Sequence, residues 1–206
     1  MSAQKTIRLP KPFIRAVPQL FGAEQAGEIQ ARIQELSREC RLPADRQLRR
    51  HLQEFILPGL AVYQVLRARG LDQAAALARV DELFELVAAP YRRQMQRLGR
   101  FPLIYPLLRL YIRLAMREYP AASWQTEWVE NSAQAIRFNM RSCFYVDTLS
   151  RYGAPELTAS FCRNDDLIYE QMSPYLTWKR TQTIGRGAQY CNFCFEQAAG
   201  IGARKA

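Results

Sequence analysis

The chain has 206 residues, of which 49% are hydrophobic and 23% charged, a balance that fits a globular protein and excludes a disordered or fibrous one. Its formal net charge is +10, but the basic residues are dispersed at helical spacing and no known nucleic-acid-binding motif accompanies them. We therefore expect a small anionic substrate as the partner, and no nucleic acid.

The five cysteines bear on the compartment in which the protein works. The odd number, and a start that lacks the apolar segment of a secretory signal, indicate free thiols in a reducing cytoplasm. The most apolar run, residues 101–116, contains Arg109 and Arg113 and is too short and too charged to span a bilayer. We expect it to form a buried amphipathic helix, with a position at a membrane surface as the alternative. A homo-oligomer is left open.

The first 120 residues are expected to be helical after a short arm. Residues 1–20 carry three prolines and several basic residues and predict an irregular arm. Asp45 and Asp72 are placed to cap the second and third helices, while Pro58 should kink or divide the second and Pro90 should end the third. Apolar residues at spacings of three and four predict helices over residues 23–40, 43–70, 72–90, 91–99 and 102–118.

The pattern changes to strands after residue 120. Two helices are expected between these strands, and a Gly-Arg-Gly turn should join the last two strands into a hairpin. The expected fold class is α+β: a helical part over residues 21–120 packed on a small antiparallel sheet with two inserted helices over residues 121–197, within one domain of residues 1–206. The predicted strands cover residues 124–130, 136–141, 176–184 and 189–196, and the inserted helices cover residues 144–152 and 155–172.

Three cysteines of the last third of the chain are expected to converge on one site. Cys162, Asp165 and Asp166 stand at positions i, i+3 and i+4 of a predicted helix and therefore share one face. Cys143 closes the second predicted strand, and Cys191 lies on the last one. A thiol beside two carboxylates is a poor packing device, because carboxylates are rarely buried without a partner.

Strand alternation decides which of these side chains share a face. Cys191 and Cys194 form a C-x-x-C motif, but alternate positions of a strand point to opposite faces. A zinc-ribbon or thioredoxin-like interpretation of this motif is therefore weak. The same alternation predicts that Cys143 lies on the side of Asn139 and Arg141.

Two chemistries fit such a cluster. In the first, a Cys162 thiolate acts as the nucleophile, Asp165 moves protons, and Arg180 or Arg141 holds an anionic substrate. In the second, the three thiolates and Asp165 bind a divalent metal such as zinc, which activates water. Buried free cysteines that merely pack as small hydrophobes are the structural alternative. We expect no cofactor, and zinc is the metal left open. His51, the only histidine, is interpreted as an ordinary helical side chain.

Several ordered motifs in the same region resemble one enzyme family. The resemblance extends over about residues 50–196 and is to the L-2-amino-thiazoline-4-carboxylic acid hydrolase family. The matching segments are F-x-x-x-x-C over residues 138–143, GAPEL over 153–157, FCRND over 161–165, RTQTI over 180–184, Gly187, CNF over 191–193, and an upstream segment ILPGLAVY over 56–63 followed by Gly70.

The resemblance implies a hydrolase that opens a cyclic amidine. Water adds at the carbon between sulfur and nitrogen, and the product is an N-carbamoyl amino acid. Asn192 stands where the family usually has Asp, a difference that can shift the substrate or abolish the parent reaction. The alternatives are a related enzyme of a biosynthetic pathway that performs another ring opening or rearrangement, and a non-catalytic module that senses a small molecule or metal. The candidate site residues are Cys162, Asp165, Cys143 and Cys191 for catalysis, and Arg180, Thr181, Asn192 and Arg141 for substrate binding.

Overall fold

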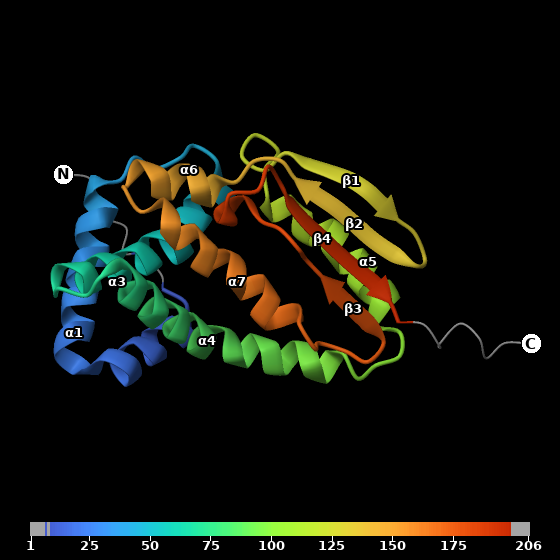
Figure 1. The fold of residues 1–206 in the computed structure, drawn as a ribbon, viewed down its shortest axis with the longest axis horizontal. Coiled ribbons are helices and arrows are strands. Elements are labelled where there is room, and N and C mark those ends of the chain that lie inside the picture. The colour runs from blue at the N-terminus through green and yellow to red at the C-terminus, as the bar shows by residue number, and fades with distance from the viewer. Residues whose placement is uncertain (1–6, 8, 199–206) are drawn as a thin grey trace, which may run out of the picture. The chain divides into compact units, whose positions relative to one another are not determined.

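The structure is a computed structural model, and it describes residue 7 and residues 9–198 (Figure 1). The chain divides into two compact units, residues 1–87 and residues 88–206. Each unit is described by itself below. The single-domain organisation stays a prediction, whereas the fold class is confirmed, because helices account for most of the described chain and the strands form one small antiparallel sheet.

The first unit is helical throughout its described part. Its core is built from apolar residues on the facing sides of α1 and α3, among them Ile29, Ile33 and Leu60, whose side chains are almost completely buried. A π-helical turn separates α2 from α3. The elements are α1 (Lys11–Glu39), α2 (Arg46–Arg50), the π-helix η1 (His51–Ile56), α3 (Leu57–Ala68) and the first part of α4 (Gln73–Leu98).

The irregular arm expected over residues 1–20 is wrong from Lys11 onward. Residues 11–20 belong to α1, because Phe13, Ala16 and Val17 are buried at the spacing of one helix face. Pro12 fits the first helical turn, where no backbone N–H is needed. The chain kinks instead at Gly22, whose φ of 78° is readily adopted only by glycine. Residues 1–6 and 8 of the predicted arm lie outside the described residues.

Other predicted helix ends are confirmed or corrected at single residues. Asp45 accepts a hydrogen bond from the backbone N–H of Leu48 at 2.9 Å, and Asp72 accepts one from Ala75 at 2.8 Å, so both caps are confirmed. The second helix is divided as expected, with α3 beginning immediately before Pro58. The expectation that Pro90 ends the third helix is wrong, because α4 continues through Pro90 to Leu98.

The second unit consists of an antiparallel sheet in the order β1-β2-β4-β3 and the helices around it (Figure 1). The two helices predicted between the strands are confirmed as α6 and α7. The third strand is shorter than expected, because β3 ends at Lys179 and the chain then continues without regular structure to the 3₁₀ turn η4. The elements are α5 (Ile104–Ala115), η2 (Met116–Glu118), β1 (Thr126–Asn131), β2 (Ala135–Met140), α6 (Phe144–Arg151), η3 (Pro155–Leu157), α7 (Thr158–Tyr169), β3 (Leu176–Lys179), η4 (Ile184–Arg186) and β4 (Cys191–Gln197).

The two faces of this sheet differ in character. The inner face is apolar: Phe138 and Phe193 stack at 4.8 Å across β2 and β4, and Tyr169 of α7 meets Phe195 edge to face at 5.1 Å. The outer face is polar, with Arg137 paired to Glu196 at 2.7 Å. An antiparallel sheet covered on one side shows this alternation. It also confirms that Cys191 and Cys194 point to opposite faces, since the Cys194 thiol donates to Glu196 on the outer face.

The end of α4 provides a test of the packing in the second unit. A Cβ atom at Gly99 would lie 2.0 Å from the backbone oxygen of Met172, an atom that cannot swing away. We expect Gly99→Ala to destabilise the protein by about 1–3 kcal/mol. Gly27→Ala is the control: Gly27 is helical with open space around it, so alanine should stabilise by up to about 1 kcal/mol. Urea unfolding followed by circular dichroism measures both, and equal effects of the two substitutions would contradict this packing.

Candidate functional site

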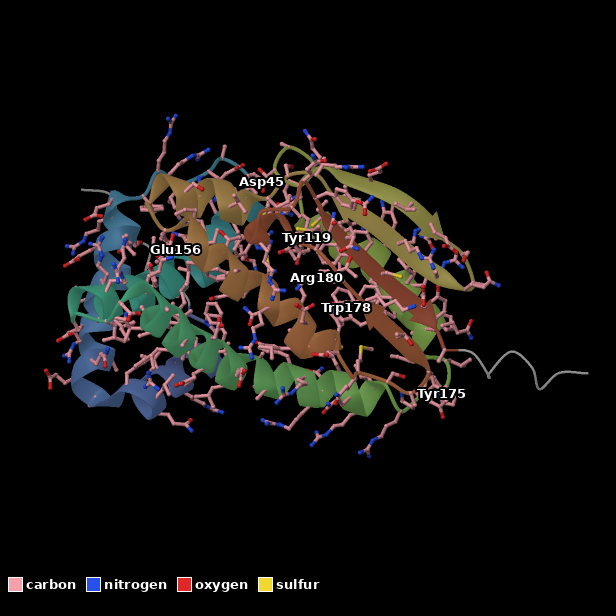
Figure 2. The ribbon with its side chains drawn as sticks, in the orientation of Figure 1. Asp45, Tyr119, Glu156, Tyr175, Trp178 and Arg180 are labelled. Carbon is pink, nitrogen blue, oxygen red and sulfur yellow. The ribbon has the colours of Figure 1, made fainter. Side chains whose placement is uncertain are left out.

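Arg180 is a cation buried between α7 and the strands. Its side chain is 2% exposed, and its guanidinium donates to Asp165 Oδ2 at 2.8 Å and to Asp166 Oδ2 at 2.6 Å. The same guanidinium donates to the carbonyl oxygen of Cys162 and lies 5.6 Å above the ring of Trp178. Figure 2 shows Arg180 and Trp178 close together beside α7. The ion pairs therefore join one turn of α7 to the segment that follows β3.

The two carboxylates differ in what else they contact. Asp166 is held from both sides, because its Oδ1 also accepts a hydrogen bond from Trp178 Nε1 at 3.0 Å. Asp165 keeps 40% of its side chain exposed, and its Oδ1 has no partner in the described part of the chain. The surrounding protein raises the pKa of Asp165 above its usual value, and the charge of Arg180 opposes that rise. Asp165 is thus the carboxylate with an oxygen available to a substrate or to water.

The thiols of Cys143, Cys162 and Cys191 lie close enough to influence one another's ionisation, and their joint role in a catalytic site stays a prediction. Cys143 precedes α6, Cys162 is on α7 and Cys191 begins β4, so three elements bring them together. Burial raises the pKa of Cys143 to about 11 and that of Cys191 to about 12, and the neighbouring thiols add to both increases. The backbone N–H of Ile184 donates to Cys191 Sγ at 3.2 Å. Both of these thiols are protonated at neutral pH.

Cys162 has the most polar surroundings of the three. Burial raises its pKa, but the hydroxyl of Thr183, the charge of Arg180 and the backbone N–H of Gly185 all lower it. The side chain is partly exposed, whereas that of Cys191 is buried. Cys162 is therefore the thiol best placed to ionise in contact with a small molecule.

The turn η4 lies directly against Cys162. A Cβ atom at Gly185 would be 2.9 Å from Cys162 Sγ and 2.8 Å from Thr158 Cγ2, so only glycine permits this approach. The hydroxyls of Thr158 and Thr183 are buried and make no well-formed hydrogen bond to any described group. Unsatisfied buried hydroxyls are uncommon in native proteins and require an explanation such as a bound ligand or water.

Arg141 does not join this cluster, and the expectation that it shares a side with Cys143 is wrong. Its guanidinium pairs with Glu127 at 2.6 Å on the outer face of the sheet and stacks on Tyr190 at 4.5 Å. The reason is that β2 ends at Met140, so strand alternation no longer applies when the chain reaches Cys143.

Thr181 and Asn192 bind each other. Asn192 Oδ1 accepts from the backbone N–H groups of Thr181 and Gln182 at 3.0 Å, and its Nδ2 donates to Thr181 Oγ1 at 2.8 Å. These bonds hold the segment after β3 beside β4, which places Arg180 and Thr183. Contact of Thr181 or Asn192 with a substrate stays a prediction.

Sequence reasoning assigned no role to several residues of the site. Asp166 was visible as the second carboxylate of the helix face, and the buried threonines Thr158 and Thr183 lie within or beside the motifs. Nothing in the sequence signals that Trp178 bonds to Asp166 or that Gly185 contacts a thiol. Within residues 9–198, no group of three Cys, His, Asp or Glu side chains has an arrangement that would hold a metal ion. The expectation of no cofactor stays a prediction, with zinc as the open alternative.

The comparisons with known proteins bear directly on this site. The sequence matches the family described as L-2-amino-thiazoline-4-carboxylic acid hydrolase over residues 49–195, which includes every residue of the cluster. The chain belongs to this family. The match confirms the resemblance expected from the motifs. The name of the family points to a hydrolase-like function.

Other comparisons add little to the family assignment. No curated protein matches the chain. Among solved structures, the crystal structure of the Fe(II) unliganded H-NOX protein from K. algicida matches with a TM-score of 0.38 and 11% identity, over 92% of this chain and 94% of that chain. A likeness this weak carries no argument about this member of the hydrolase family.

In the described part of this protein, no helix is long and apolar enough to cross a membrane.

The buried cation yields a stability prediction. Arg180→Met leaves two partly exposed carboxylates without their shared counterion, and we expect it to cost about 2–3 kcal/mol of unfolding free energy, less than the loss of a fully buried ion pair because water can solvate them in part. Arg137→Met is the matched control, because Arg137 also binds carboxylates but is exposed on the outer face, where ion pairs contribute little. Chemical denaturation compares the two variants. Equal stability of both would show that the Arg180 ion pairs do not hold this region together.

Proposed function

We propose that the protein hydrolyses a carboxylate-bearing cyclic amidine of the 2-amino-thiazoline-4-carboxylate type, with Cys162 as the nucleophile. The reaction class comes from the family. The observation that supports the assignment to Cys162 is the surroundings of its thiol: the hydroxyl of Thr183, the charge of Arg180 and the backbone N–H of Gly185 all lower its pKa, and η4 lies directly against Sγ. Such a set of donors suits a thiolate, or the negative charge that forms during attack on an amidine carbon.

The steps follow from this arrangement. The Cys162 thiol gives its proton to the Asp165 carboxylate, and the thiolate attacks the amidine carbon. The bond from that carbon to the ring sulfur then breaks, and the leaving sulfur takes the proton from Asp165. A covalent isothiourea on Cys162 remains. Asp165 then removes a proton from water, which attacks the same carbon, and the Cys162 sulfur departs and is reprotonated. The product carries an N-carbamoyl group and a free thiol.

Asp165 suits the proton-transfer role better than Asp166 does. It lies one helical turn beyond Cys162 on α7, and one of its oxygens is unoccupied, whereas both oxygens of Asp166 are bonded. The raised pKa of Asp165 brings its protonation equilibrium closer to neutral pH, where a general acid or base is most effective.

Arg180 takes a different role from the one expected of it. Its guanidinium is buried and already bonded to two carboxylates, so direct binding of a substrate carboxylate would require displacing one of them. The geometry favours a positioning role, in which Arg180 fixes Asp165 and lowers the pKa of Cys162. The substrate carboxylate must therefore be bound by another cation or by a set of backbone N–H groups.

The nucleophile is tested by Cys162→Ser. We expect kcat for 2-amino-thiazoline-4-carboxylate to fall at least about a thousandfold, because a hydroxyl is a far weaker nucleophile than a thiolate. Release of the new thiol, measured with a chromogenic disulfide, follows the reaction. Cys194→Ser is the control. Cys194 lies on the outer face of the sheet, away from Cys162, and its loss should leave kcat unchanged.

The covalent step separates this mechanism from metal-assisted attack by water. Mass spectrometry of the acid-quenched wild-type reaction should show an adduct on the peptide that contains Cys162. Full turnover by Cys162→Ser, together with loss of wild-type activity in a chelator, would overturn the nucleophile assignment and favour the metal alternative.

The proton-transfer role is tested by the pH dependence of Asp165→Asn. The carboxylate must be ionised to accept a proton, so the wild-type rate should fall as the pH drops through the raised pKa of Asp165. The Asn variant should lose roughly 100-fold to 10,000-fold in kcat and should no longer show that decline. Asp166→Asn should mainly lower stability, because Asp166 bonds to Trp178 and Arg180. The same pH profile for wild type and Asp165→Asn would contradict the assignment.

A further inference from the structure

Helix α5 (Ile104–Ala115) is apolar on two opposite faces. One face, with Leu108 and Ile112, is buried, and Tyr105 at its start donates from its hydroxyl to the backbone oxygen of Ser132 at 3.0 Å. The sequence predicted this buried face. The second apolar face consists of leucines at spacings of four, three and four, which places them in one row on the helix. These are Leu103, Leu107, Leu110 and Leu114, and their exposed fractions lie between 49% and 60%.

The exposed row of leucines is bordered by arginines. Residues 98–117 contain four arginines and no aspartate or glutamate. Arg109 is used inside the fold, where it donates to the backbone oxygen of Asn131 at 2.7 Å. Arg113 and Arg117 stand one turn apart beside the leucines, and neither forms an ion pair within the described part of the chain.

These two arginines also line an open cleft of about 380 Å³ at the end of α5. Its other walls are Met116, Asn131 and Trp128, and the indole of Trp128 is 43% exposed. Two unpaired guanidiniums with a methionine and an indole make a site for an anionic group that has an apolar part attached.

We propose that α5 docks this protein on an anionic lipid bilayer, with the leucine row in the outer acyl region and phosphate headgroups at Arg113 and Arg117. An amphipathic helix that carries large apolar residues on one side and arginines at their border binds in the plane of such a surface. A second copy of the chain is a poorer occupant, because two α5 helices facing each other would bring these arginines together while α5 itself carries no acidic residue. The next acidic residue, Glu118, already makes an interaction within the fold.

The test is flotation of the full-length protein with lipid vesicles. We expect a partition coefficient at least about tenfold higher on vesicles of phosphatidylcholine with 30% phosphatidylglycerol than on phosphatidylcholine alone, and a decrease of that binding as salt is raised. Bromine-labelled lipids should quench the fluorescence of Trp128. In a Trp128→Phe variant this quenching should be absent, which would identify Trp128 as its source.

Two paired substitutions test the residues. Leu107→Gln/Leu110→Gln should reduce binding at least about tenfold, because it removes two side chains that would enter the acyl region. Arg113→Gln/Arg117→Gln should reduce binding to anionic vesicles about tenfold or more. Leu42→Gln and Arg92→Gln/Arg93→Gln are the matched controls, because they remove an exposed leucine and the same amount of charge elsewhere. The controls should bind as the wild type does.

Several results would overturn the proposal. One is wild-type protein that stays with neither kind of vesicle, and another is equal binding by the leucine, arginine and control variants. A third is a dimer in sedimentation velocity that Leu107→Gln/Leu110→Gln abolishes while no vesicles are bound, which would assign the leucine row to a second copy. A fourth is saturable binding of inorganic phosphate that depends on Arg113 and Arg117 without vesicle binding, which would make the cleft a site for a soluble anion.

Discussion

The burial of one positive charge governs the arrangement around the candidate site. A guanidinium that is 2% exposed is tolerated only if its hydrogen bonds are satisfied and its charge is balanced. Asp165, Asp166 and the carbonyl oxygen of Cys162 provide both, and all three belong to one turn of α7. The segment after β3 must therefore approach α7 at that turn, which also brings η4 to Cys162. The fold satisfies the charge and positions the thiol by the same contacts.

The three thiols show how burial and reactivity oppose each other. Cys143 and Cys191 gain packing from burial and lose ionisation by it, since each pKa rises to about 11 or 12. Cys162 is subject to the same burial, but Thr183, Arg180 and Gly185 reduce its effect. A cluster that looks uniform in the sequence thus has one thiol with polar neighbours and two that mainly fill space. The chemistry assigned to the site depends on this difference.

Much of the fold follows from the sequence, because it depends on local patterns. The caps at Asp45 and Asp72, the four strands and the inserted helices α6 and α7 all rest on spacing, turn chemistry or alternation within a few residues. The errors arose where tertiary contacts override a local rule. Helix α4 passes through Pro90, and the first prolines of the chain do not break α1, because Phe13 and Val17 supply a buried helix face.

The candidate site divides in the same way. Strand alternation separated Cys191 from Cys194 correctly, since both lie within β4. It misplaced Arg141 because β2 had already ended. The bonding of Arg180 by two carboxylates could not be deduced either, because the sequence places Arg180 and Asp165 on separate elements and gives no distance between them. Spacing along the chain predicts which residues share a face, and packing decides which faces meet.

The edges of the sheet have a consequence for the behaviour of the protein in concentrated solution. An unpaired strand edge is a template for adding strands from other molecules, and that is a route to aggregation. Here β3 has only 4 residues, and β1 has a register shift between Trp128 and Glu130 that interrupts its ladder. Neither edge offers a long regular row of free backbone groups. The sheet can therefore remain open at both sides without inviting growth into fibrils.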